Sequence, residues 1–410
     1  MQHKGINHKR MSHSNKLIVF NLIRLKGPIT RTELAQISGL SKAAISSSVK
    51  KLLNRNIITE SKHEGYKEVG RKPLLLSVNP QAVYFISVDI GFTETQFSVT
   101  DLNNHQVSKI QRETPRTWKQ ILNLLTQDIQ KVSNWSNVSR KKVKGASIGI
   151  PGVVDSDGTV SYLPKIGDSQ DYPLQEKLSS KIEMPILLEN NVNLATLGEL
   201  SMQYGDHSNL VYISFHRDGL GAGIAINGSL YEGAEGHAGE IGWFVTNRNS
   251  LDGKQKDNQG FLESQVTATA LTDKCINLLK KRDSDDPLLD KVDDPGQLDV
   301  ETIFRGYRTS SVANQVIEEW VKDVATSLVA ISSLLDPDLI ILGGEIVESA
   351  KPAFQELTDL IDKQTQRTPK IEVSDNYTDN VLHGGAQLCF ENLDKLIWEE
   401  RVSHGEDINF

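Results

Sequence analysis

The segment PILLENNVNLATLGE, residues 185–199, changes character halfway along its length. An apolar run ends at Glu189, the amides of Asn190 and Asn191 follow, and a helical pattern begins at Leu194. A strand that leads directly into a helix is typical of α/β folds, and polar side chains at such a junction are well placed to hold a ligand. Both amides can hydrogen-bond a sugar, but neither can take a proton from a hydroxyl. The segment by itself leaves open an enzyme site, a binding site and a simple helix cap.

The alternation of strands and helices continues on both sides of this segment. Residues 84–102, YFISVDIGFTETQFSVTDL, indicate two strands around a glycine turn, and residues 118–132 form an amphipathic helical pattern. Residues 320–346 indicate a long helix, a short Asp-Pro turn, a buried strand and a Gly-Gly turn. The repetition predicts an α/β architecture with two related lobes around a cleft.

Composition narrows the class of protein. The chain has 410 residues, of which 38% are apolar, and this suffices for packed cores in two or three globular units. It contains no apolar stretch of about 18 residues and no hydrophobic N-terminal segment, so we expect neither a membrane span nor a secretory signal. The two cysteines, Cys275 and Cys389, are far apart, which argues against a disulfide framework or a cysteine-based zinc site and favours a cytoplasmic location.

Charge is distributed unevenly along the chain. Residues 1–77 contain 15 Lys or Arg and 4 Asp or Glu, a net charge of +11, whereas the remainder contains 30 and 49, a net charge of −19. A basic N-terminal part on an acidic body predicts that only the N-terminal part approaches a polyanion such as nucleic acid.

Three helical patterns follow one another in this basic part: SNKLIVFNLIRLKG (14–27), TRTELAQISG (30–39) and SKAAISSSVKKLLNRN (41–56). The second opens with a capping box formed by Thr30 and Glu33, and a glycine ends each of the first two. Two helices, a tight turn and a third helix are the order of a helix-turn-helix motif.

Residues 57–78 then indicate two strands around a polar turn, which is the shape of a wing. We therefore expect a winged helix-turn-helix DNA-binding domain over residues 14–77, preceded by a disordered arm over residues 1–13. A three-helix module that binds another protein is the alternative.

Two parts of this domain carry candidate DNA contacts. The third helix exposes short and cationic side chains opposite its apolar face, which lets its backbone lie deep in a major groove. Cations and helix N-termini hold phosphates, and a compact basic wing tip fits the narrow minor groove of A·T-rich DNA. The candidates are Lys42, Ala43, Ser46, Ser47 and Lys50 on the helix, Arg31 and Ser41 with Lys50 for phosphates, and Gly70, Arg71, Lys72 and Pro73 for the minor groove.

The body resembles the ROK family, which joins sugar kinases and sugar-responsive repressors on an actin-like ATPase fold, over residues 84–390. The resemblance rests on VDIGFTET, GIPGVVD, LLENNVNLATLGE, GLGAGIAINGSLYEG, GAEGHAGEIGW and LLDPDLIILGGEI, in that order. It implies a two-lobed, ribonuclease H-like sugar-kinase fold, and an N-terminal winged helix is the layout of the family's repressors. We expect a small α/β lobe over residues 78–187, completed by residues 380–410, and a large α/β lobe over residues 188–379 with the effector site and the dimer contacts.

The chain departs from the family's kinases wherever they need catalytic or phosphate-binding groups. Their acidic general base is replaced by Asn191, which forfeits about 10²–10⁴-fold in rate. In the first phosphate loop Phe92 replaces a glycine and Glu94 adds negative charge, and in the second loop Asp218 would face the phosphates. These departures predict a body that does not phosphorylate sugar.

The family's zinc site is also absent from the sequence. Its His and three Cys positions are occupied by Trp243, Lys254, Lys256 and Phe261, which cannot form a tetrahedral site for zinc. We expect no metal and no cofactor, and we expect the rings of Trp243 and Phe261 to fill the vacated volume.

The positions that surround the sugar in the family are retained. As a group they favour binding, because convergent polar groups give orientation and specificity in a cleft. The alternative is structural, since Glu189 and Asn193 are also suited to capping the following helix. The candidate sugar-binding residues are Gly152, Asn190, Asn191, Glu240 and Glu263, together with Trp243 in place of the zinc-site His.

Together these expectations predict that the protein is a sugar-responsive transcriptional repressor of carbohydrate-utilisation genes. Its partners would be operator DNA, a second copy in a homodimer or a dimer of dimers, and a small sugar; the resemblance to the family's xylose repressors favours xylose or a related aldose. Ligand closure of the lobes would change the spacing of the two winged helices. The alternatives are an active ATP-dependent sugar kinase and a regulator whose effector is a partner protein.

Overall fold

The computed structural model describes residues 8–62, 73–162, 171–202, 204, 207–251, 259–281, 286–289 and 295–393. The chain folds into two compact units. The first contains the chain up to Glu189 and again from Gly385 onward, and the second runs from Asn190 to Gly384. Within the described residues no helix has the length and apolar character needed to cross a membrane.

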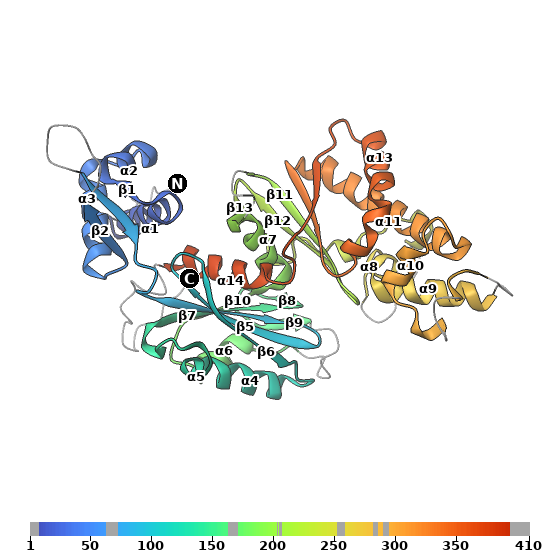
Figure 1. Ribbon diagram of the computed structural model, residues 1–410, viewed down its shortest axis with the longest axis horizontal. Coiled ribbons are helices and arrows are strands. Elements are labelled where there is room, and N and C mark those ends of the chain that lie inside the picture. The colour runs from blue at the N-terminus through green and yellow to red at the C-terminus, as the bar shows by residue number, and fades with distance from the viewer. Residues whose placement is uncertain are drawn as a thin grey trace, which may run out of the picture. The chain divides into compact units, whose positions relative to one another are not determined.

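The N-terminal part of the first unit is a winged helix-turn-helix (Figure 1). Its elements are α1 (His8–Lys26), β1 (Ile29–Thr30), α2 (Arg31–Ser38), α3 (Lys42–Asn54), β2 (Ile58–Lys62) and β3 (Leu74–Val78). Thr30 caps α2 and forms the predicted capping box with Glu33, and Gly39 ends α2 in the left-handed conformation with φ 67°. The wing sheet has the order β1-β3-β2, and both of its strand pairs are antiparallel.

Helix α1 begins earlier than we predicted. Residues 8–13, which we expected in a disordered arm, belong to this helix, because neither Gly nor Pro interrupts the chain between His8 and Lys26. Residues 1–7 and the wing-tip residues Gly70, Arg71 and Lys72 lie outside the described residues.

The small lobe is built on a five-stranded sheet in the order β10-β7-β4-β5-β6: β4 (Tyr84–Ile90), β5 (Glu94–Asp101), β6 (Gln106–Glu113), β7 (Val143–Ile150) and β10 (Ile186–Asn190). Strand β4 pairs antiparallel with β5 and parallel with β7. A hairpin of β8 (Val153–Val154) and β9 (Val160–Tyr162) follows β7. The helices are α4 (Trp118–Gln130), α5 (Val132–Ser136) and α6 (Leu174–Ser179), which cover one face of the sheet, and the first unit's part of α14 (Asn380–Glu391) lies on the other (Figure 1).

Strand β4 separates two hydrophobic cores because its side chains alternate between the faces of the sheet. Ile86 and Val88 pack with α4, whereas Phe85 packs on the opposite side against Phe390 of α14, with ring centroids 5.6 Å apart in an edge-on arrangement. The same second core contains Phe20 and Ile23 of α1. The winged helix and the small lobe therefore share one core.

The second unit repeats the sheet plan of the first. Its strands are β11 (Leu210–Phe215), β12 (Leu220–Ile226), β13 (Ser229–Leu230), β14 (Leu339–Gly343) and β15 (Lys370–Val373), in the order β13-β12-β11-β14-β15. In both sheets the third, second, first, fourth and fifth strands of the lobe lie side by side. The first strand pairs antiparallel with the second, the second pairs antiparallel with the third, and the first pairs in parallel with the fourth. This confirms the two related lobes predicted from the repeated pattern.

Helices cover the second sheet on both faces. One face carries the main core, in which Trp320 packs against Phe215 and Phe304. On the other face α7 lies directly on β12, where only glycine fits at position 223, since a Cβ there would lie 1.9 Å from Thr196 Oγ1. The helices are α7 (Asn191–Met202), α8 (Glu263–Val266), α9 (Ala268–Lys281), α10 (Val300–Arg305), α11 (Ser311–Leu335), α12 (Val347–Ala350) and α13 (Phe354–Gln364).

Candidate functional site

The opening motif of the body lies where β10 ends and α7 begins. The side-chain carbonyl of Asn190 accepts hydrogen bonds from the backbone N–H groups of Val192 (2.7 Å) and Asn193 (3.4 Å). Asn190 therefore caps α7, which commits its oxygen to the helix. Asn191 is the first residue of α7 and is half-buried. Asn190 thus has a structural role in this motif, and sugar binding by Asn190 and Asn191 stays a prediction.

Two carboxylates interact electrostatically in the second unit. Glu240 precedes the short 3-10 helix Ile241–Trp243, and Glu263 is the first residue of α8. Burial raises the pKa of Glu263 to about 7, and the charge of Glu240 adds to this effect. Burial also raises the pKa of Glu240, which His237 partly offsets. Partly desolvated carboxylates of this kind are strong acceptors for sugar hydroxyls.

Two further side chains belong to this cluster. The Gln259 side chain hydrogen-bonds Glu263, and the charge of Asp218 contributes to the raised pKa of Glu263. We did not predict a role for Gln259, because it lies in a polar loop where no residue pattern distinguishes it.

The loops that zinc joins in the family are held together here by backbone packing. The N–H of Leu262 donates to the carbonyl of Phe244 at 3.1 Å, and a Cβ on Gly260 would lie only 2.1 Å from the carbonyl oxygen of Gly242. Trp243 does not fill the vacated volume as expected, since 49% of its surface is exposed.

Metal ligands do not assemble in the described parts of the chain. Among those residues, no group of three His, Cys, Asp or Glu side chains could hold a metal ion. Lys254 and Lys256, which occupy two of the family's zinc-ligand positions, lie outside the described residues. The predicted lack of a zinc site therefore stays a prediction.

The first phosphate loop is unsuited to a nucleotide. Asp89 is the penultimate residue of β4, its Oδ1 atom is buried without a hydrogen bond among the described residues, and burial raises its pKa to about 7. Phe92 follows in the turn, and the carboxylate of Glu94 accepts a hydrogen bond from the amide of Gln111. A bulky ring and an added carboxylate stand where backbone N–H groups must approach phosphate.

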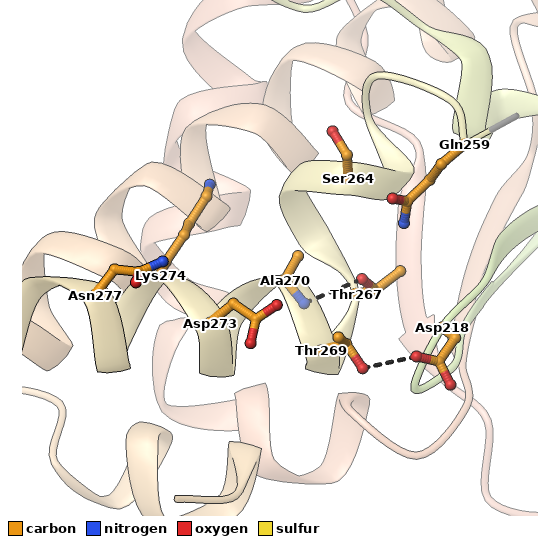
Figure 2. A pocket seen from close by; sticks show the side chains of 9 residues that line it. All are labelled: Asp218, Gln259, Ser264, Thr267, Thr269, Ala270, Asp273, Lys274 and Asn277. Carbon is orange, nitrogen blue, oxygen red and sulfur yellow. Dashed lines mark hydrogen bonds between the residues drawn. The ribbon is translucent and has the colours of Figure 1, made fainter. Parts of the chain in front are cut away.

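The second loop is fixed to α9 by a carboxylate. The hydroxyl of Thr269 donates to Asp218 Oδ1 at 2.7 Å, and the N–H of Thr269 donates to the carbonyl of Arg217 at 3.0 Å. A pocket of about 340 Å³ opens beside this contact, and Figure 2 shows Asp218, Thr267, Thr269 and Asp273 around it. Its wall combines carboxylates, hydroxyls and amides with the ammonium group of Lys274, a set of groups that suits a polyhydroxylated ligand.

The predicted DNA-reading face of α3 is exposed. Lys42, Ala43, Ser46, Ser47 and Lys50 are all on the solvent side, whereas Ile45, Ser48 and Val49 face the core. Four of the five exposed side chains lie in the first two turns of the helix, where they can approach base edges.

Two of the predicted phosphate contacts have structural partners. Arg31 forms an ion pair of 2.5 Å with Glu60 of β2, which ties α2 to the wing. The Ser41 hydroxyl accepts a hydrogen bond from the N–H of Ala44 at 3.2 Å and caps α3. Lys50, the third predicted phosphate contact, is exposed, and Pro73 is half-buried immediately before β3.

The candidate sugar residues are shared between the units. Asn190, Asn191, Glu240, Trp243 and Glu263 belong to the second unit, and Gly152 lies in the first, between β7 and β8. The second unit therefore supplies the acidic and amide groups.

The sequence matches the ROK family over residues 85–389. The chain belongs to the ROK family. Residues 14–59 match winged helix-turn-helix DNA-binding domains. The chain is 26% identical to the xylose repressor of Caldicellulosiruptor bescii, over 88% of this chain and 90% of that protein. It is 25% identical to the DNA-binding transcriptional dual regulator NagC of Escherichia coli K12, over 85% of each.

Solved structures of this ROK-family fold include regulators and kinases. A ROK family transcriptional regulator described as a homologue of the E. coli MLC protein superposes with a TM-score of 0.80 at 22% identity, covering 93% of this chain and 96% of that one. A ROK glucokinase from Streptomyces griseus superposes with a TM-score of 0.61 at 25% identity, covering 74% and 98%. The regulator matches nearly the whole chain, which includes the winged helix.

Proposed function

We propose that this ROK-family protein is a sugar-responsive transcriptional repressor. The observation that carries the proposal is the exposed Lys42–Lys50 face of α3 on a body whose ligand motif presents amides and carboxylates. The names of the repressors to which the chain is similar support the same reading.

The described residues at the family's base and phosphate-loop positions are unsuited to phosphate transfer. Asn191 cannot accept the proton that leaves a sugar hydroxyl during phosphorylation. Phe92, Glu94 and Asp218 each disfavour a nucleotide at the two loops. We infer that the sugar acts as an allosteric ligand and leaves the protein unchanged.

The charges of the site define the class of sugar. Glu240, Glu263 and Asp218 interact electrostatically, and Asp273 lines the adjoining pocket. Lys274 lines the same pocket, so two carboxylates and one ammonium group face it. The remaining excess of negative charge disfavours a dianionic phosphate, whereas neutral hydroxyls gain charge-assisted hydrogen bonds. The proposed effector is therefore an unphosphorylated sugar, and xylose or a related aldose is favoured by the names of the similar repressors.

The proposed partner on the DNA side is a pair of operator half-sites. A homodimer would place two copies of α3 in successive major grooves. The basic wing tip, with Arg71 and Lys72, would add minor-groove contacts.

Calorimetry and operator binding test the proposal together. Xylose, glucose, N-acetylglucosamine and their phosphates are titrated into the protein, and each sugar that binds is added to a complex with an operator selected from a random duplex pool. We expect heat from an unphosphorylated aldose and a matching change in operator affinity. Binding by none of these sugars would favour a protein effector, and turnover with ATP would favour a kinase.

A further inference from the structure

The contact between the DNA-binding domain and the small lobe includes a charged group. Arg24, near the end of α1, donates from Nη2 to the side-chain oxygen of Gln387 at 3.0 Å. Its guanidinium carbon lies 4.5 Å from the centroid of the Phe390 ring. Both partners belong to α14, and Phe390 also contacts Phe85 of the small-lobe sheet. One side chain of α1 is thus held by a hydrogen bond and a cation–π contact to a helix of the body.

The amide of Gln387 is oriented from both sides. Its oxygen accepts from Arg24, and its N–H donates to the carboxylate of Glu391 at 2.9 Å. A cation on one side and an anion on the other leave the amide a single satisfied orientation. The three side chains form one hydrogen-bonded chain along the contact.

This polar chain lies at the edge of an apolar core and is imperfectly satisfied. The Asn21 Oδ1 and Arg24 Nε atoms are buried and have no hydrogen-bond partner among the described residues. Burial lowers the pKa of Arg24, and Glu391 offsets part of this effect. Burial of polar atoms without partners costs free energy, which separation of α1 from α14 would recover. The free energy that favours the docked arrangement is therefore smaller than the apolar contacts alone would give.

The other end of α14 is fixed within the second unit. The side-chain N–H₂ of Asn380 donates to Glu199 at 2.6 Å and to the Ser374 hydroxyl at 2.9 Å. Glu199 is buried near the end of α7, the helix that begins at Asn191. A Cβ on Gly384 would lie 1.7 Å from the carbonyl oxygen of Leu194, so α14 also packs directly on α7. Helix α14 therefore joins the helix of the ligand motif to the DNA-binding domain.

We propose that the contact of Arg24 with Gln387 and Phe390 positions the winged helix on the body and that a sugar bound at the start of α7 changes operator affinity through α14 and this contact. The second clause rests on the proposed function. The first clause concerns docking alone and can be tested without sugar.

Gln387→Leu removes the acceptor of Arg24 and keeps a side chain of similar size. Gln175→Leu is the control for loss of a glutamine side chain, because Gln175 of α6 donates a 3.0 Å hydrogen bond to the carbonyl of Ile186, a residue of the other core of the same unit. Hydrogen exchange of residues 17–26, operator affinity with and without sugar, and sugar affinity by calorimetry are measured on both full-length variants.

We expect Gln387→Leu to speed exchange in residues 17–26 and to reduce the ratio of operator affinities with and without sugar by at least about fivefold, while sugar affinity stays within about twofold. Arg24→Lys keeps the charge but lacks the planar fork, so it should move the same readouts in the same direction if Gln387→Leu fails to fold. Exchange and coupling equal to those of Gln175→Leu would overturn the proposal. If no sugar changes the operator affinity of the parent protein, the proposed function and the coupling through α14 are both wrong. The docking role of Arg24 would then be tested by hydrogen exchange and by operator affinity measured without sugar.

Discussion

Asp218 and Thr269 are joined by a 2.7 Å hydrogen bond that fixes a carboxylate at the turn between β11 and β12, beside the pocket of the second unit. In a kinase of this family the corresponding turn would have to approach phosphate. Here it presents negative charge that is held in place by its own hydrogen bond. The bond therefore holds one of the charged groups of the pocket wall, as well as the loop that carries it, in place.

Asp218→Asn should weaken the discrimination against phosphorylated sugars. We expect the parent protein to prefer an aldose over its phosphate and the variant to reduce that preference by about threefold to tenfold, because one repulsive charge is removed. Calorimetry with the aldose and its phosphate measures the preference. Asp362→Asn, which neutralises the acceptor of a Thr–Asp bond of the same length on α13, should leave it unchanged. An unaltered preference in Asp218→Asn would show that this wall does not face the ligand.

Glu263→Gln should stabilise the free protein in alkaline solution and weaken sugar binding. The pKa of Glu263 is about 7 in the folded chain and 4.5 in the unfolded chain, so the folded state binds the proton more tightly. The ionised group therefore lowers stability above pH 7, and this cost disappears as the pH falls towards 4.5. We expect the variant to gain about 1 kcal/mol at pH 8, with allowance for solvent screening, and little at pH 4.5.

Thermal denaturation at both pH values measures this gain, and calorimetry measures the loss of sugar affinity. Glu113→Gln, at an exposed carboxylate of β6, is the control for a general charge effect. A gain of equal size at the two pH values would contradict the assigned pKa.

Lys42→Ala should reduce operator affinity, because it removes a cationic side chain from the face of α3 that is predicted to lie in the major groove. Lys42 is exposed at the first position of α3. The matched control is Lys119→Ala, which removes an exposed lysine from α4 of the acidic body. Fluorescence anisotropy at several salt concentrations separates the two. Identical curves for both variants would mean that α3 does not enter the groove.

Asn191→Asp should not create a sugar kinase. The variant regains the acidic group of the family's kinases, but Phe92, Glu94 and Asp218 still oppose nucleotide binding. We expect no ATP-dependent sugar phosphorylation in a coupled assay. Turnover in this single variant would show that the phosphate loops are functional and that only the base was missing.

Structural features that depend on neighbouring residues were predictable from the sequence, whereas contacts between distant residues were not. The capping box of Thr30 and Glu33 and the exposed face of α3 depend on neighbouring residues, and the sequence carried both. The pair Arg31–Glu60 depends on how the wing folds back, so Arg31 was assigned to phosphate instead. Arg24 and Gln387 are 363 residues apart, and no local pattern links them.

The prediction that the Trp243 ring fills the volume left by zinc was wrong for a similar reason, because it depended on a long-range contact. The backbones at Gly242 and Gly260 approach each other and leave the ring half exposed. Backbone approach of this kind depends on two glycines in different loops, and their proximity is not encoded by spacing.

The most direct test of the central claim is operator affinity measured during titration with unphosphorylated aldoses, with the sugar recovered afterwards. We predict that one such sugar changes operator affinity by about tenfold or more and is recovered chemically unchanged in the presence of ATP. Conversion of the sugar to its phosphate, or operator affinity that none of the sugars alters, would contradict the account.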